Sequence, residues 1–107
     1  MNISTLSAMC GLSVATIEKI NTVFAAYPEL TKVMLYGSRA KGHYRAGSDI
    51  DLTLFGDALT YEQSGKIATQ LDDLYLPYTF DLSLFKQIDN SDLVDHIRRV
   101  GIVFYAL

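Results

Sequence analysis

Cysteine is nearly absent from this sequence, and so are several features that mark familiar protein classes. The one cysteine among 107 residues, Cys10, excludes an intrachain disulfide, so we expect a reducing compartment and a cytoplasmic protein. No apolar run is long enough to span a bilayer, and no basic residue precedes an apolar run at the N-terminus, so we expect no membrane association. Zinc-ligand spacing, a Ser-His-Asp arrangement and a dinucleotide-binding glycine pattern are also missing.

Net charge and length exclude further classes. The net charge of −3 gives no general attraction to nucleic acid, so we expect no direct nucleic-acid binding. We expect residues 1–107 to form one small domain with little room for a second. Because 50% of the residues are apolar, we expect a partner or a second copy to cover part of the surface, in a homo- or hetero-oligomer.

Glycine and proline are sparse, and they divide the chain into segments with helical or alternating apolar patterns. The first twelve residues give weak signals and at most a short helix. The pattern predicts an α/β fold of the α+β type, in which helices flank a small mixed sheet. The predicted helices span 14–26, 38–41, 60–75 and 92–99, with caps at Ser13, Ser38, Thr60 and Ser91, and the predicted strands span 33–36, 49–55, 78–85 and 102–106.

A Gly37-Ser38 turn follows the first predicted strand and has the composition of a phosphate site. Glycine lets the backbone approach a phosphate closely, and Ser38 offers a hydroxyl together with the N–H groups of a helix start. Three cations follow within seven residues, namely Arg39, Lys41 and Arg45. We expect at least one of them to contact phosphate.

Asp49 and Asp51 form a carboxylate pair in a segment that otherwise resembles a buried strand. Residues i and i+2 of a strand point to the same face, so the two carboxylates would lie together and repel one another. A divalent cation with hard oxygen ligands relieves such repulsion. The pair therefore predicts a magnesium-dependent nucleotide site.

Asp81 is the third candidate acid, because the pattern around Asp51 recurs around it. Asp51–Phe55 reads DLTLF and Asp81–Phe85 reads DLSLF, so each segment places an acid, a hydroxyl and an aromatic ring on one face. If the two strands are neighbours, the acids share a site; otherwise Asp81 lies at a solvated strand end. In the shared site, Asp81 would complete the metal site and accept the proton of an attacking hydroxyl.

The stretch from Tyr36 to Leu52, YGSRAKGHYRAGSDIDL, resembles the DNA polymerase beta-type nucleotidyltransferase superfamily. Ten residues separate Gly37-Ser38 from Asp49-Ile50-Asp51, and Asp81 follows on a later strand. Within the superfamily, the stretch is most similar to the minimal nucleotidyltransferases called MNT or MntA-like antitoxins. The resemblance covers nearly the whole chain, although Lys41 stands where an arginine is common.

The resemblance implies an activity and a partner. Such proteins use ATP and Mg²⁺, with two ions expected, and transfer AMP to a tyrosine of a small all-helical HEPN-domain toxin, which silences it. It implies metal ligation and catalysis by Asp49, Asp51 and Asp81. It implies nucleotide contacts by Gly37, Ser38, Arg39, Lys41 and Ser48.

Two other functions remain open at this point. The domain could neutralise a partner by covering it without turnover, or it could modify the hydroxyl of a small molecule with a second subunit completing the site. His96, in the last predicted helix, is interpreted as an ordinary surface histidine.

Overall fold

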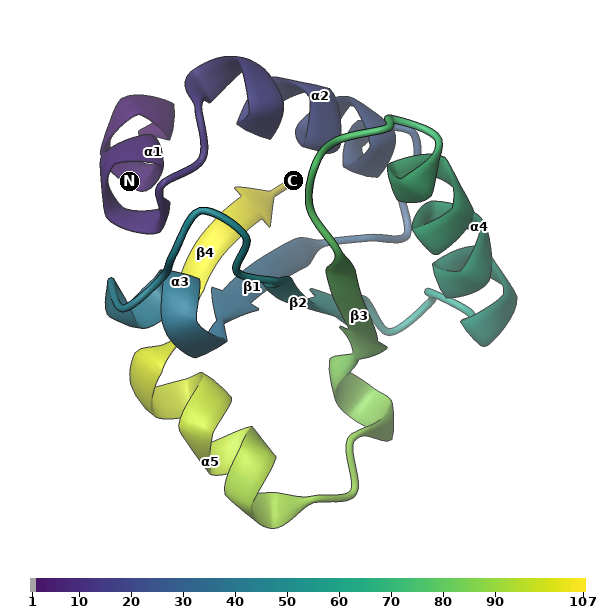
Figure 1. Cartoon of the computed structure of the whole chain (residues 1–107). Helices are drawn as coiled ribbons and strands as arrows, with labels where there is room; N and C mark the ends of the chain where they lie inside the picture. The colour runs from purple at the N-terminus through teal and green to yellow at the C-terminus, as the bar shows by residue number, and fades with distance from the viewer. Residues whose placement is uncertain (1) are drawn as a thin grey trace.

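A four-stranded mixed sheet forms the centre of the computed structural model, which describes residues 2–107 (Figure 1). Figure 1 shows α1, α2 and α4 on one side of this sheet and α5 on the other. The predicted α/β fold with a mixed sheet is confirmed. The elements are α1 (Ile3–Cys10), α2 (Val14–Ala25), β1 (Lys32–Tyr36), α3 (Gly37–Lys41), β2 (Ile50–Phe55), α4 (Tyr61–Asp72), β3 (Phe80–Leu84), the 3-10 helix η1 (Phe85–Gln87), α5 (Ser91–Val100) and β4 (Ile102–Ala106).

The strands follow the order β3-β2-β1-β4, so β2 and β3 are neighbours. Strand β1 runs antiparallel to both β2 and β4, whereas β2 and β3 are parallel. In the parallel pair, Asp51 lies opposite Asp81 and Thr53 lies opposite Ser83. The repeated sequence pattern of the two strands is therefore also a repeat in space.

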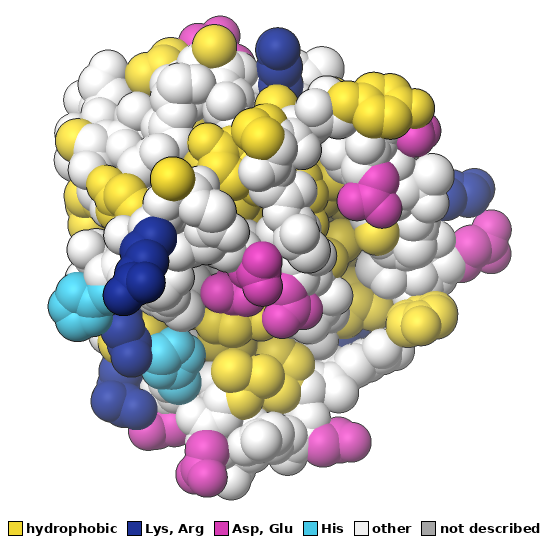
Figure 2. Space-filling view, viewed as in Figure 1, with side chains coloured by type: hydrophobic (Ala, Val, Ile, Leu, Met, Phe, Trp, Pro, Cys, Tyr) yellow, Lys and Arg dark blue, Asp and Glu magenta, His cyan; other side chains and the backbone are white. Residues whose placement is uncertain are grey.

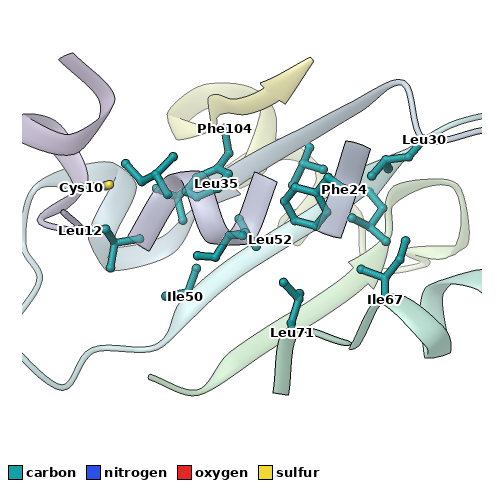
Figure 3. Close-up of a cluster of buried hydrophobic side chains, with 14 of the residues drawn as sticks. Cys10, Leu12, Phe24, Leu30, Leu35, Ile50, Leu52, Ile67, Leu71 and Phe104 are labelled. Atoms are coloured by element: carbon teal, nitrogen blue, oxygen red, sulfur yellow. The ribbon is translucent and has the colours of Figure 1, made fainter. Parts of the chain in front are cut away.

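Apolar side chains on the face of β2 opposite to Asp51 form part of the core. Ile50, Leu52 and Leu54 are buried there, against the apolar stripes of α2 and α4. Burying an aliphatic side chain of this size contributes about 1.5–3 kcal/mol. Figure 3 shows this cluster and labels Cys10, Leu12, Phe24, Leu30, Leu35, Ile50, Leu52, Ile67, Leu71 and Phe104.

Two of the predicted helix caps are confirmed and two are wrong. Ser13 Oγ accepts the Thr16 N–H at 3.1 Å, and Thr60 forms a reciprocal capping box with Gln63. The cap of α5 is Asn90 rather than Ser91, because an Asn carbonyl oxygen there accepts two backbone N–H groups. Ser38 does not cap α3, which begins one residue earlier at Gly37 and has no side-chain cap.

Helix α1 is better formed than its weak sequence signals indicate. The Asn2 side chain accepts the Thr5 N–H at 2.8 Å, and Gly11 ends the helix in the left-handed conformation with φ 75°. Met1 lies outside the described residues. Within residues 2–107, no single helix is long and apolar enough to cross a membrane, and α1 with α2 reaches that length only across a 112° bend.

Several predicted boundaries differ from the structure, most of them by one or two residues. Strand β2 begins at Ile50, so Asp49 precedes it, and α4 ends at Asp72 instead of Tyr75. Strand β3 is shorter than predicted, because Phe85 turns into η1 and stacks on Phe55 with ring centroids 4.4 Å apart.

Lys86 ties η1 to the turn that follows β2. Its ammonium group donates to the carbonyl oxygens of Gly56, Asp57 and Leu59 at 3.2, 3.0 and 2.6 Å. The bonds fix the end of β3 beside the end of β2, which supports the alignment of the two strands at the acids.

Candidate active site

Asp51 and Asp81 occupy equivalent positions on the two parallel strands, which meets the condition under which the repeated pattern predicted a shared site. Asp51 is partly buried, whereas Asp81 and Asp49 are exposed. In the next row on the same face, Ser83 Oγ donates to Thr53 Oγ1 at 3.0 Å. The strands therefore bring two acids together above a bonded hydroxyl pair, and Asp49 lies one residue before β2.

Burial of Asp51, followed by the negative charges of Asp81 and Asp49, raises the pKa of the Asp51 carboxyl from 3.8 to about 6. The charges of Asp81 and Asp49 therefore act on the Asp51 carboxyl. As they are positioned, residues 2–107 contain no group of three or more His, Cys, Asp and Glu side chains that could hold a metal ion. Carboxylate oxygens are the ligands that a hard divalent cation prefers, so the three acids fit such an ion by their chemistry. Of the three, Asp51 and Asp81 are the two that the sheet pairs directly.

The Gly37-Ser38 turn lies against the same acid. Gly37 has φ +74°, and a Cβ atom added to it would fall on Asp51 Oδ2. The absence of a side chain at Gly37 therefore lets the Asp51 carboxylate pack directly against the turn. Ser38 is partly buried, and its carbonyl oxygen accepts the His43 N–H at 2.9 Å.

Gly37→Ala is expected to disable the site. The methyl group would displace the Asp51 carboxylate, and the left-handed backbone costs a non-glycine residue about 1–2 kcal/mol. We expect a loss of at least about 10²-fold in kcat/KM for nucleotidyl transfer, corresponding to about 3 kcal/mol.

Gly42→Ala is the matched control for that substitution. Gly42 has φ +78°, but nothing lies within 4 Å of an added Cβ. It therefore carries the backbone strain without the contact to Asp51. Similar losses of kcat/KM in both variants would show that backbone strain, rather than contact of the added methyl group with the Asp51 carboxylate, causes the loss.

The Arg39 side chain, one of the expected phosphate contacts, lies in the interior of the protein instead of at the open surface. The side chain is only 1% exposed. Its guanidinium donates to the carbonyl oxygens of Cys10 at 2.9 Å and Ser48 at 3.0 and 3.1 Å. Carbonyl groups thus satisfy this cation, and Arg39 joins α1 to the loop that leads to Asp49.

Two aromatic rings complete the surroundings of this guanidinium. Its central carbon lies 5.4 Å from the Tyr44 ring centroid and 4.9 Å from the Tyr78 ring centroid. Flat rings beside a desolvated guanidinium supply favourable cation–π contacts. The segment carrying Arg39 is therefore a structural clamp.

The other predicted nucleotide contacts occupy different parts of the same segment. Lys41 is exposed, so its ammonium group is free to move over the surface. Ser48 is partly buried, and its Oγ accepts the Arg45 N–H at 2.7 Å. Ser48 thus shapes the loop before Asp49 through both its hydroxyl and its carbonyl oxygen.

Tyr36 and His96 belong to the surroundings of the acids, although the sequence interpretation assigned neither to the site. Tyr36 lies opposite Asp51 in the sheet, and the His96 ring meets it edge-on at a centroid distance of 6.2 Å. Burial raises the pKa of the Tyr36 phenol; the Ser83 hydroxyl lowers it, and the charges of Asp81 and Asp51 raise it. The position directly before Gly37 was the available signal for Tyr36, whereas the packing of His96 depends on tertiary structure.

The acids face an open surface rather than a deep pocket. Figure 2 shows acidic side chains gathered near the middle of this face, with Lys, Arg and His side chains beside them. A hollow of about 760 Å³ lies elsewhere, between α1, α2 and β4, and none of the predicted site residues lines it. An open site suits an acceptor that supplies its own enclosing surface.

Asp51→Asn is expected to stabilise the protein at pH 8 without metal. The pKa of Asp51 in the folded state, about 6, exceeds its unfolded value, so the stabilisation from the protonated form is complete below 3.8 and is lost as the pH rises through 6. The neutral amide in Asp51→Asn does not ionise, so the variant does not lose this stability as the pH rises. A fully buried group would give about 3 kcal/mol, and partial exposure reduces the expected gain to about 1–2 kcal/mol.

Urea unfolding at pH 4 and pH 8 tests this prediction. The variant and the wild type should differ at pH 8 and converge at pH 4, and saturating Mg²⁺ should favour the wild type at pH 8. Asp89→Asn, at an exposed position before α5, is the matched control. Equal free energies of unfolding for the wild type and Asp51→Asn at pH 8 would contradict the prediction.

The structure thus brings the paired acids of two parallel strands next to a glycine turn. The chain belongs to the family described as Polymerase beta, Nucleotidyltransferase, whose model matches residues 18–106. No curated protein matches the chain.

Solved structures share the fold. A chain of a toxin-antitoxin structure with AMP-PNP is 22% identical, with a TM-score of 0.68, over 85% of this chain and 73% of that one. The MntA-HepT toxin-antitoxin structure gives 18% identity and a TM-score of 0.64 over 89% and 74%. A complex of tri-AMPylated Shewanella oneidensis HEPN toxin with MNT antitoxin gives 19% and 0.63 over 87% and 71%.

Proposed function

We propose that this chain is a magnesium-dependent nucleotidyltransferase that transfers AMP from ATP to a tyrosine of a HEPN-type toxin, as the antitoxin of that pair. The observation that carries the proposal is the pairing of Asp51 with Asp81 beside the Gly37 turn. The family and the toxin-antitoxin complexes that share the fold support it.

The side chains at the site would divide the work of the reaction. The tyrosine oxygen attacks the α-phosphorus of ATP, the new O–P bond forms, and the bond to the β-phosphate oxygen breaks to release diphosphate. Asp81, exposed and opposite Asp51, would accept the tyrosine proton. The Gly37-Ser38 turn would hold the phosphates, with Lys41 and Ser48 as further contacts.

Asp49, Asp51 and Asp81 would hold one or two Mg²⁺ ions. When bound, the cation neutralises phosphate charge and stabilises the oxygens that gain charge in the transition state. The raised pKa of Asp51 supports this assignment, because a bound cation would offset the repulsion that Asp81 and Asp49 exert on the Asp51 carboxylate.

An open face supports a protein acceptor over a small one. Enclosed pockets bury most of a small ligand, whereas the acids here lie on an exposed surface. A partner protein would complete the site and exclude water from it. The apolar share of the sequence, 50%, agrees with a chain that buries surface against a partner.

Incubation with Mg²⁺, ATP labelled at the α-phosphate and the protein encoded by the neighbouring gene tests the proposal. We expect label on a tyrosine of that protein and loss of its toxicity. Label at the γ-phosphate should not transfer, because diphosphate leaves. If the toxin is neutralised by binding but carries no label, the chain acts by occlusion instead. If the label appears on a small molecule, that molecule and not the toxin is the acceptor.

A further inference from the structure

Strand β3 forms one edge of the sheet and lies on the side of the catalytic acids. Within residues 2–107 it pairs with β2 only, so its outer backbone N–H and C=O groups have no strand partner there. Such a row of groups is a template for one more strand. Asp81, the proposed proton acceptor, is part of this edge.

A groove of about 240 Å³ follows this edge. Leu82, Ser83 and Leu84 of β3 line it, together with Tyr61 of α4 and with Gln87 and Ile88 beyond the strand. Successive strand residues point to opposite faces, so three in a row can line one groove only if it runs along the edge. The groove therefore has the direction of an added strand.

The groove begins one row along β3 from Asp81. Ser83 lines it, follows Asp81 by two residues on the same face, and bonds to Thr53 of β2 at 3.0 Å. A residue directly opposite Asp81 on an added strand would have its Cβ about 4.5–5.5 Å from that of Asp81. The side chains of that residue's diagonal neighbours also come within reach of the acids.

We propose that the β3 edge receives a segment of the acceptor protein that lies outside its helices, which adds to the sheet as a fifth strand and presents its tyrosine hydroxyl to Asp81. Main-chain hydrogen bonds supply the affinity in this mode, and side chains of alternate residues supply the specificity. One set faces the acids, and the other faces the apolar groove beside Tyr61 and Leu82. The inference rests on the proposed function and names how its substrate binds.

The charge of the edge defines the chemistry of the segment. Asp81 is the charged residue of β3, and Asp49 and Asp51 lie beside it. An acidic acceptor segment would be repelled, so the segment is free of Asp and Glu near its tyrosine and carries Lys or Arg there. The reaction is unchanged: the tyrosine oxygen bonds to the α-phosphorus, diphosphate leaves, and Asp81 takes the proton.

The first test combines Tyr61→Ala with Gln87→Ala, which change the groove and leave the acids intact. Both side chains are exposed, Tyr61 by 74%, so the fold should not change. We expect the KM for the acceptor protein to rise at least about tenfold, which corresponds to about 1.4 kcal/mol, while the KM for ATP stays the same. Tyr75→Ala, at a tyrosine that is 88% exposed and outside the groove, is the matched control.

The second test uses synthetic peptides that contain the labelled tyrosine of the acceptor. One copy is N-methylated at every second residue, and another is methylated in the opposite register. Only alternate N–H groups of a strand face its neighbour, so one register should lose at least tenfold in kcat/KM and the other should not. Equal rates for both copies would contradict strand addition.

The outcomes separate the two proposals. Transfer to the acceptor with an unchanged KM in the Tyr61/Gln87 variant overturns the edge inference and leaves the proposed function standing. Absence of transfer by the wild type overturns both. Label on a small-molecule hydroxyl, with none on protein, also excludes a polypeptide at the edge.

Discussion

Asp49→Asn and Asp51→Asn are each expected to lower the rate of AMP transfer by at least about 10³-fold, which corresponds to about 4 kcal/mol of transition-state stabilisation. Each substitution removes one negative charge from the proposed Mg²⁺ site while preserving shape. Asp51 has the larger expected effect, because it lies opposite Asp81 and against the Gly37 turn. Single-turnover transfer at saturating ATP measures the loss.

Stability distinguishes a catalytic role of these acids from a structural one. Asp51→Asn should keep the far-UV circular dichroism of the wild type and unfold at a higher urea concentration at pH 8, since the amide removes an unfavourable buried charge. Asp89→Asn should transfer AMP at the wild-type rate. A variant at position 49 or 51 that loses activity because it unfolds would show that the acid is structural.

Arg39→Met is expected to cost about 2–4 kcal/mol of folding free energy, the second large effect. The guanidinium is buried, and its loss leaves the carbonyl groups of Cys10 and Ser48 without their donor. Hydrogen bonds to charged groups contribute about 1.5–3 kcal/mol, and an unsatisfied buried acceptor adds a similar penalty. Urea unfolding measures the change.

Two further variants separate shape from charge at this position. Arg39→Lys keeps the charge but cannot present a planar fork to carbonyls from two segments, so it should recover less than half of the loss. Arg45→Met removes an exposed cation from the same loop and should change the folding free energy by less than about 0.5 kcal/mol. If Arg39→Lys is as stable as the wild type, the fork geometry has no structural role.

The pairing of the acids could be predicted because its signal is local and repeated. DLTLF and DLSLF both alternate with period two, so each strand by itself fixes which residues share a face. The sequence left open whether the two strands are neighbours. In the structure they are, and their parallel register places Asp51 opposite Asp81. Gly37 was identifiable for the same reason, since a glycine at the end of a strand marks a turn.

Arg39 could not be assigned correctly from its neighbours in the sequence. A cation following Gly-Ser resembles a phosphate ligand, and the carbonyl groups that bind it are invisible in a sequence, because every residue has one. One of these belongs to Cys10, 29 residues away. The same limit applies to His96, whose contact with Tyr36 arises from the packing of α5 on β1.

Where helices begin was predictable only in part. Ser, Thr, Asn and Asp all favour the cap position, so Asn90-Ser91 offers two candidates one residue apart. Asn90 is the cap because its backbone is extended, whereas Ser91 is already in the helix. At α3 the helix begins at Gly37, and Tyr36 in the cap position makes no side-chain hydrogen bond to the first turn.

The clamp at Arg39 has a consequence for the choice of expression boundaries. The matched family span begins at residue 18, yet Cys10, just upstream of Gly11, supplies a carbonyl oxygen to the guanidinium, and the Tyr44 ring lies against Gly11. A fragment trimmed to that span would retain every acid and the Gly37 turn. It would nevertheless leave the loop before Asp49 loosely anchored, so the N-terminal helix belongs to the folded unit that holds the candidate site although it contains none of the candidate residues.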